Sequence, residues 1–139
     1  MQIGIDFYYS GDTSVNGVAA VTMKNNIITN CSLYGLRVGS FNVNDVTGDY
    51  NLWYGNANDV YWNGTNKTLA TYKTQSPYNE AHSISANPSC VSASTGNYRL
   101  NAGSPAIDKG TTISKVANDM DYAARPKGLA YDIGAYESY

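Results

Sequence analysis

The dipeptides Asn26-Ile27 and Asn51-Leu52 recur 25 positions apart, and this repeat restricts the possible folds more than any other feature. An offset of this size lies in the range of solenoid repeats. If each repeat forms one coil, equivalent residues stack about 4.8 Å apart. A repeated Asn can then hydrogen-bond to its copy in the next coil, as in an Asn ladder. The alternative is a coincidental match in a chain that is rich in Asn.

Composition favours strands and turns. The chain has 139 residues, which fits one domain with a modest core. Charged residues make up 14% of it, below the ~25% of typical soluble proteins, and Asn, Ser, Thr, Gly and Tyr are abundant instead. The net charge of -2 provides no basic face for nucleic acid. No apolar run approaches the ~20 residues of a membrane-spanning helix.

Short patterns predict several strands and one helix. The first seven residues alternate apolar and polar side chains, which is typical of a strand. Leu69 and Tyr72 fall on one face of a short helix predicted to reach Thr74. The other predicted strands span 18–23, 35–38 and 60–62.

A further strand is predicted where Tyr98 and Leu100 alternate with polar neighbours, which indicates a half-buried segment. Gly103 permits the bend that follows. Asp108 precedes Gly110, and its carboxylate is expected to accept backbone N–H bonds in a local Asx turn.

The C-terminal half resembles a known type of protein. The phrases NYRLNAGSPAID, DMDYAARP and YDIGAYE, with LATYKTQSPYNEAHSISANP before them, are similar to the ending of bacterial right-handed parallel β-helix proteins of the pectate-lyase-like type. The resemblance covers the chain from Lys24 onward. It implies an all-β fold: a short right-handed parallel β-helix of two to three coils with a loop-rich C-terminal cap. Within a single domain, 1–139, the coils are expected over 1–62 and the closing segment over 63–139.

The same resemblance implies an extracellular or cell-surface protein, although no signal peptide begins this chain. We therefore expect the chain to be the end of a longer exported protein. An open solenoid end exposes unpaired backbone groups, so self-association through the N-terminal coil is expected. Cys31 and Cys90 match neither a disulfide framework nor a metal pattern, and we interpret them as small buried side chains.

Charged residues of the closing segment are interpreted as structural, because buried charges require partners. Asp119 and Asp121 are expected to hold turns or to pair with Arg125. His82, the single histidine, is interpreted as a hydrogen-bonded structural residue and not as part of a catalytic triad. The predicted structural residues of the closing segment are Asp108, Asp119, Asp121, Arg125, Asp132 and Glu137.

The resemblance also implies candidates for catalysis, since β-helix polysaccharide lyases use an Arg or Lys base and usually a calcium ion. Lys24 and Arg37 are the candidate bases, which would remove the α-proton of a uronate. Calcium is the one cofactor considered, and only for a lyase. The alternative is that all of these residues are ordinary solvated charges. The candidate calcium ligands are Asp6, Asp45 and Asp49.

The clustered aromatic residues cannot all face inward on alternating strands; they are Tyr8, Tyr9, Trp53, Tyr54, Tyr61 and Trp62. Tyr and Trp combine a flat apolar face with a polar edge, which suits a sugar ring. The predicted glycan contacts are Trp53, Tyr54, Tyr61 and Trp62, with Trp53 and Trp62 favoured; the alternative is that they belong to the core. The predicted function is a non-catalytic C-terminal β-helix module that binds polysaccharide. A lyase acting on acidic glycans and a self-assembling structural module are the alternatives.

Overall fold

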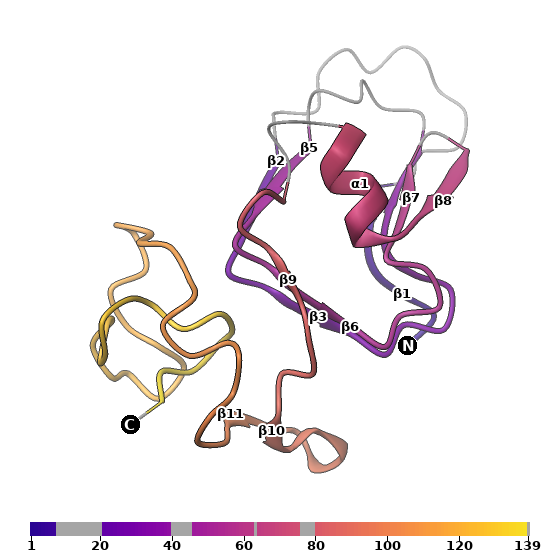
Figure 1. The fold of residues 1–139 in the computed structure, drawn as a ribbon. Coiled ribbons are helices and arrows are strands. Elements are labelled where there is room, and N and C mark those ends of the chain that lie inside the picture. The colour runs from indigo at the N-terminus through magenta and orange to yellow at the C-terminus, as the bar shows by residue number, and fades with distance from the viewer. Residues whose placement is uncertain (8–20, 40–45, 63, 76–79, 139) are drawn as a thin grey trace.

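The chain consists mainly of short β-strands (Figure 1). The computed structural model describes residues 1–7, 21–39, 46–62, 64–75 and 80–138. In these residues the predicted all-β class is confirmed, with one α-helix, α1 (Leu69–Gln75), and one 3-10 turn, η1 (Ala93–Thr95). Neither is long and apolar enough to cross a membrane. The strands are β1 (Ile3–Phe7), β2 (Val21–Lys24), β3 (Ile27–Thr29), β4 (Tyr34–Val38), β5 (Val46–Asp49), β6 (Leu52–Tyr54), β7 (Val60–Trp62), β8 (Thr65–Lys67), β9 (Ile84–Ser85), β10 (Cys90–Ser92) and β11 (Asn97–Leu100).

From β1 to β7, consecutive strands belong to different sheets and pair in parallel with later strands, whereas the consecutive pairs β7–β8 and β10–β11 are antiparallel hairpins. β1 pairs with β4 and β4 with β7, β2 pairs with β5, and β3 pairs with β6 and β6 with β9. Ile27 lies beside Leu52 in one of these sheets. The hydroxyls of Thr22 and Thr47 meet at 3.2 Å in another, also 25 residues apart. The repeat read from the sequence is therefore confirmed as the register of two parallel sheets.

The corners between strands recur with the same offset. Asn25 and Tyr50 occupy equivalent corners and both have left-handed backbones, with φ of 57° and 56°. Asn30 and Gly55 occupy the next pair of corners, with φ of 55° and 65°. Asn and Gly tolerate this left-handed conformation best. Asn25, Asn30 and Gly55 therefore favour the turns at these corners, and Tyr50 is the exception.

The two repeated asparagines contact each other as predicted. The backbone N–H and the side-chain amide of Asn26 both donate to Asn51 Oδ1, at 2.9 and 3.0 Å. Asn51 is fully buried, and its Nδ2 donates to the carbonyl of Met23 at 3.0 Å. This side chain therefore satisfies backbone groups inside the molecule, where an unpaired group would be costly.

The main hydrophobic core lies between the sheets, and α1 covers it near β7. Leu69 and Tyr72 are both only 3% exposed, so the predicted inward face of the helix is confirmed. Asp59 Oδ2 accepts the N–H of Leu69 at 2.8 Å and satisfies a donor in the first turn. The Tyr72 ring packs against Trp62 with centroids 5.1 Å apart. The buried members of this core are Met23, Ile28, Cys31, Leu36, Val38, Val46, Trp53, Val60, Leu69 and Tyr72.

A second core joins the C-terminal segment to the sheet β3-β6-β9. Leu52, Ala106 and Ile133 are completely buried together. Asn25 Nδ2 donates to the carbonyl of Thr111 at 2.8 Å, and the Thr111 N–H donates back to Asn25 Oδ1 at 2.9 Å. Figure 1 shows the orange and yellow C-terminal segment beside β3 and β9. Parallel pairing thus continues past residue 62 into β9, within the predicted closing segment.

Carboxylates hold the turns of this C-terminal segment, as predicted for Asp119. Asp119 Oδ1 accepts the N–H groups of Asp121 and Ala123, and its Oδ2 accepts that of Glu137, all within 3.0 Å. Burial alone would raise the pKa of Asp119, but these backbone donors and the nearby Arg125 outweigh it and lower the pKa. Asp132 similarly accepts from the N–H groups of Asp108 and Ser138.

Other predicted contacts in this segment are wrong. Asp108 Oδ1 accepts the N–H of Ala130 at 2.9 Å, so it forms a long-range contact and not a local turn with Gly110. Asp121 pairs with Arg99, and Arg125 pairs with Glu137 instead of an aspartate.

The strand predicted around Tyr98 and Leu100 is confirmed as β11, which pairs with β10 in a short antiparallel hairpin. Leu100 is half-buried against the second core, but Tyr98 is 54% exposed, so its predicted burial is wrong.

Candidate binding groove

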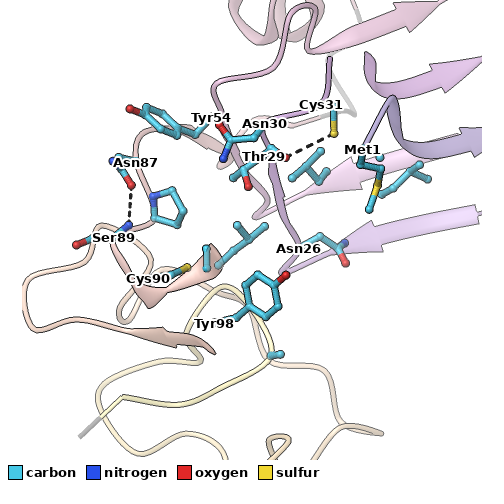
Figure 2. Close-up of a pocket in the computed structure, with 18 of the residues that line it drawn as sticks. Met1, Asn26, Thr29, Asn30, Cys31, Tyr54, Asn87, Ser89, Cys90 and Tyr98 are labelled. Carbon is cyan, nitrogen blue, oxygen red and sulfur yellow. Dashed lines mark hydrogen bonds between the residues drawn. The ribbon is translucent and has the colours of Figure 1, made fainter. Parts of the chain in front are cut away.

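A groove of about 910 Å³ lies between β3 and the segment that carries β10 and β11 (Figure 2). β1 also contributes to one end of it. Its lining combines side-chain amides, apolar groups and two tyrosines. The lining residues are Met1, Gly4, Ile5, Asn25, Asn26, Ile27, Ile28, Thr29, Asn30, Cys31, Tyr54, Asn87, Pro88, Ser89, Cys90, Ala93, Tyr98, Gly134 and Ala135.

Two exposed tyrosines mark the groove. Tyr54 is 40% exposed and comes from the end of β6, whereas Tyr98 is 54% exposed and comes from β11. Figure 2 shows Tyr54 near Asn87 and Tyr98 near Asn26, with the tyrosines well apart in the view. Two flat aromatic faces are thus available along the same groove.

Asparagines provide most of the polar lining. Asn26 is held from inside by its bonds to Asn51, and Asn87 Oδ1 accepts the N–H of Ser89 at 2.9 Å. Asn30 is exposed at the corner after β3. The amides of Asn30 and Asn87 can each donate and accept, which matches the hydroxyl groups of a sugar. The amide of Asn26 already donates to Asn51 and to the carbonyl of Lys24.

The described residues that line the groove include no Asp, Glu, Lys, Arg or His. Lys24, which directly precedes the lining residue Asn25, is exposed at the end of β2. Arg99, next to Tyr98, donates to Asp121 and lies over the ring of Tyr136 with 4.6 Å to its centroid. The side chains that line the groove are therefore uncharged and amphipathic, while the N-terminal ammonium of Met1 opposes the rise in the pKa of the neighbouring Cys31 thiol.

The structure brings only one of the four predicted glycan contacts into this groove. Tyr54 lines it, but Trp53 is completely buried in the core, so its predicted exposure is wrong. Tyr61 packs against Tyr34 with centroids 4.9 Å apart, on a different sheet. Trp62 is half-buried against the core, also away from the groove. Tyr8 and Tyr9, which belong to the same aromatic set, lie outside the described residues.

The buried Trp53 has a hydrogen-bond partner, the carboxylate of Glu80, which the sequence analysis did not predict. Glu80 is completely buried, and its Oε2 accepts the indole N–H of Trp53 at 3.2 Å. Asn51 Nδ2 donates to both carboxylate oxygens, and the Ser83 hydroxyl donates to Oε2. Burial raises the pKa of Glu80, although these hydrogen bonds oppose the increase. A single Glu in a polar loop gives no sequence signal for this role.

Lys24 and Asp49 lie side by side in the register of β2 and β5. Asp49 Oδ2 is 2.7 Å from His82 Nδ1, and its Oδ1 accepts the His82 backbone N–H. Burial alone would raise the pKa of Asp49, but the contacts with His82 and the N–H of Tyr50 lower it. The imidazole stacks on Tyr50 with centroids 4.6 Å apart, so the prediction of a hydrogen-bonded His82 is confirmed.

The second candidate base lies on another sheet. Arg37 Nε donates to Asp6 Oδ1 at 2.9 Å across β1 and β4, while Lys24 belongs to the sheet β2-β5. The structure therefore separates Lys24 from Arg37, and likewise Asp6 from Asp49. Asp45 lies outside the described residues, and among those described no group of three His, Cys, Asp or Glu could hold a metal ion.

Both cysteines are free. Cys31 is buried as predicted, and burial raises the pKa of its thiol, whereas Cys90 is only half-buried in the groove wall.

Comparisons with known proteins identify no relative. A scan against protein-family models found no match, and searches of curated proteins and of solved structures found no similar protein.

Proposed function

We propose that the chain is a short right-handed parallel β-helix module of a secreted or surface protein, and that it binds polysaccharide without catalysis. The observation that carries this proposal is the groove whose lining includes two exposed tyrosines and several asparagine side chains.

The parallel register supports the proposed architecture. The chain visits three sheets in the same order twice, first through β1, β2 and β3 and then through β4, β5 and β6. The residues paired between β2 and β5 and between β3 and β6 are separated by the same number of positions. The hydrogen bond between Asn26 and Asn51 is of the kind expected between stacked coils. Parallel connections of this type are right-handed in nearly all proteins, which is the basis for the proposed hand.

The chemistry of the groove supports the proposed ligand. Tyrosine offers an apolar face and a polar edge, and a sugar ring has both kinds of surface. A non-catalytic role is supported by the position of the two candidate bases, since neither Lys24 nor Arg37 is among the residues that line the groove.

Removing either groove tyrosine is expected to weaken oligosaccharide binding. Tyr54→Ala and Tyr98→Ala should each raise Kd about five- to tenfold, which corresponds to the ~1 kcal/mol of one aromatic contact. Isothermal titration calorimetry with a glycan found by array screening measures the effect. The matched control is Tyr122→Ala, since Tyr122 is 90% exposed and does not line the groove. Equal weakening by all three substitutions, or by none, would contradict the groove as the site.

Self-assembly is a second candidate function, favoured by the uneven burial of equivalent apolar residues. Ile5 and Phe7 of β1 are half-buried, whereas their partners in β4, Leu36 and Val38, are completely buried. Among the strands that the structure describes, β1, β2 and β3 each lie at the edge of a sheet, and α1 covers the core near β7. Edge strands of this kind are suited to pairing with a second copy of the chain.

Analytical ultracentrifugation over a range of protein concentrations tests this second function. A concentration-dependent dimer is expected, and Ile3→Lys on β1 should weaken it, with Val91→Lys on exposed β10 as the control. Because β1 also lines the groove, a bound oligosaccharide should shift the equilibrium toward the monomer. A monomer at all concentrations would reject self-assembly and leave the glycan proposal intact.

A further inference from the structure

We propose that two copies of the chain pair head to head through β1, in antiparallel orientation about a two-fold axis. This inference rests on self-assembly, the second proposed function, and adds the strand, the register and the symmetry of the interface. Among the described strands, β1 forms one edge of the sheet β1-β4-β7-β8. Pairing of two β1 strands would join two such sheets into one, with each copy contributing the same surface.

The first argument is the incomplete burial of the apolar residues of β1. These residues are half-buried, and two of them pack against the main core. Ile5 lies beside Leu36 and Phe7 beside Val38 in β4, and both β4 residues are completely buried. A second β1 strand would cover the apolar side chains and pair with the backbone along the same edge. Hydrophobic burial and strand pairing therefore favour the same interface.

The second argument is that the sequence of β1 favours one register. β1 consists of five residues, Ile3–Phe7, and Ile5 is the central one. A two-fold axis at Ile5 pairs all five residues and keeps the apolar side chains of both copies on the inner face. It also places Asp6 opposite Gly4 of the other copy. An axis at Asp6 would instead place two carboxylates opposite each other, which is destabilising.

The third argument is that the other edge of this sheet differs from β1. There β8 pairs with β7 in an antiparallel hairpin, and it has only three residues, with Thr65 and Asn66 exposed and Lys67 half-buried. α1 follows directly and buries Leu69 and Tyr72 in the core. Short polar edge strands resist further pairing. Addition of β1 to β8 is therefore disfavoured, and assembly stops at a closed dimer instead of growing into a filament.

Cysteine cross-linking tests the register. Facing residues of an antiparallel pair have Cα atoms about 4.5–5.5 Å apart, which suits a disulfide. Ile5→Cys should therefore be oxidised by oxidised glutathione to a disulfide with its own copy. Ile3→Cys is the matched control on the same face, because it would lie about 14 Å from its own copy at ~3.4 Å per residue. On non-reducing gels we expect about tenfold more covalent dimer from Ile5→Cys than from Ile3→Cys.

Two controls make this comparison decisive. Both variants carry Cys31→Ala and Cys90→Ser, which remove the two native thiols. Sedimentation of the reduced Ile5→Cys variant verifies that it still dimerises. If it does not, a mixture of Ile3→Cys and Phe7→Cys chains replaces it, because these two positions face each other in the same register and should form the covalent dimer.

A charge on β8 tests the direction of assembly. Asn66 is exposed on β8, and Asn66→Lys should leave the Kd of the dimer within about twofold of the wild-type value. Ile3→Lys on β1 should raise this Kd about tenfold or more. Sedimentation velocity at increasing concentration should show the dimer as the largest species, because a two-fold interface is used up when two copies meet.

The possible failures are distinguishable. Dimerisation without the expected covalent dimer would overturn the β1 register, while self-assembly stands. A dimer weakened by Asn66→Lys, or species that keep growing with concentration, would overturn the head-to-head arrangement. A monomer at every concentration would overturn both self-assembly and this inference, and the glycan-binding proposal would stand.

Discussion

Arg125→Ala is expected to reduce the free energy of unfolding by about 3–5 kcal/mol. The Arg125 side chain is 5% exposed and that of Glu137 is 1% exposed, with Nη1 and Oε1 2.9 Å apart. Arg125 also donates to the carbonyls of Asp132 and Gly134. Its removal would leave a buried carboxylate without its cation and two carbonyls without this donor.

Arg99→Ala is the matched control for this substitution. Arg99 forms an ion pair of the same type with Asp121, but both side chains are about half exposed, at 49% and 46%. Water and salt screen such a pair, so its loss should change stability little. In thermal unfolding, Arg125→Ala should lower Tm by roughly 10 °C, at the 2–4 °C per kcal/mol typical of this chain length. Unchanged Tm with lost ligand binding would instead assign Arg125 to a binding role.

Glu80→Ala is the second large expected effect, at about 3 kcal/mol of unfolding free energy. The carboxylate accepts from Asn51, Trp53 and Ser83 in a completely buried position. Its removal would deprive the buried Trp53 indole N–H of its acceptor and leave a cavity. Urea unfolding measures the loss, and Asp121→Ala is a control that removes a carboxylate from an exposed site. A loss as small as that of the control would contradict a structural role for Glu80.

The pH dependence of stability separates the charge of Glu80 from its packing. Burial raises the pKa of Glu80 in the folded protein, whereas an unfolded Glu titrates near ~4.3. The folded state then holds this proton more tightly, so the stabilisation is complete below the unfolded pKa and is lost as pH rises through the folded pKa. Glu80→Gln cannot titrate. The unfolding free energy of the wild-type protein should fall relative to Glu80→Gln as pH rises through this window, and a constant difference would contradict the raised pKa.

Much of the local structure was predictable because local patterns determine it. The alternation in the first seven residues, the apolar face of Leu69 and Tyr72, and the Asn-apolar repeat all correspond to observed elements or pairings. These features depend on nearest neighbours and on a fixed spacing along the chain. The turn-holding carboxylates Asp119 and Asp132 were also predictable as a class, since buried charges require partners.

The orientation of the aromatic residues was not predictable. Leu52 and Trp53 are adjacent in β6 and both are completely buried, because this sheet is covered on both faces. Alternation then no longer distinguishes inside from outside. The Glu80 carboxylate, which accepts the Trp53 N–H from 27 residues away, is invisible to any local pattern.

The amino-acid sequence by itself determined the class of secondary structure, the 25-residue register and the positions of several strands, because short-range periodicity and turn preferences act within a few residues. Only the tertiary structure decided which faces are covered, which charges meet, and that Tyr54 and Tyr98 border one groove. The physical reason is that such contacts join segments far apart in the chain, and their free energy depends on burial that no single segment specifies.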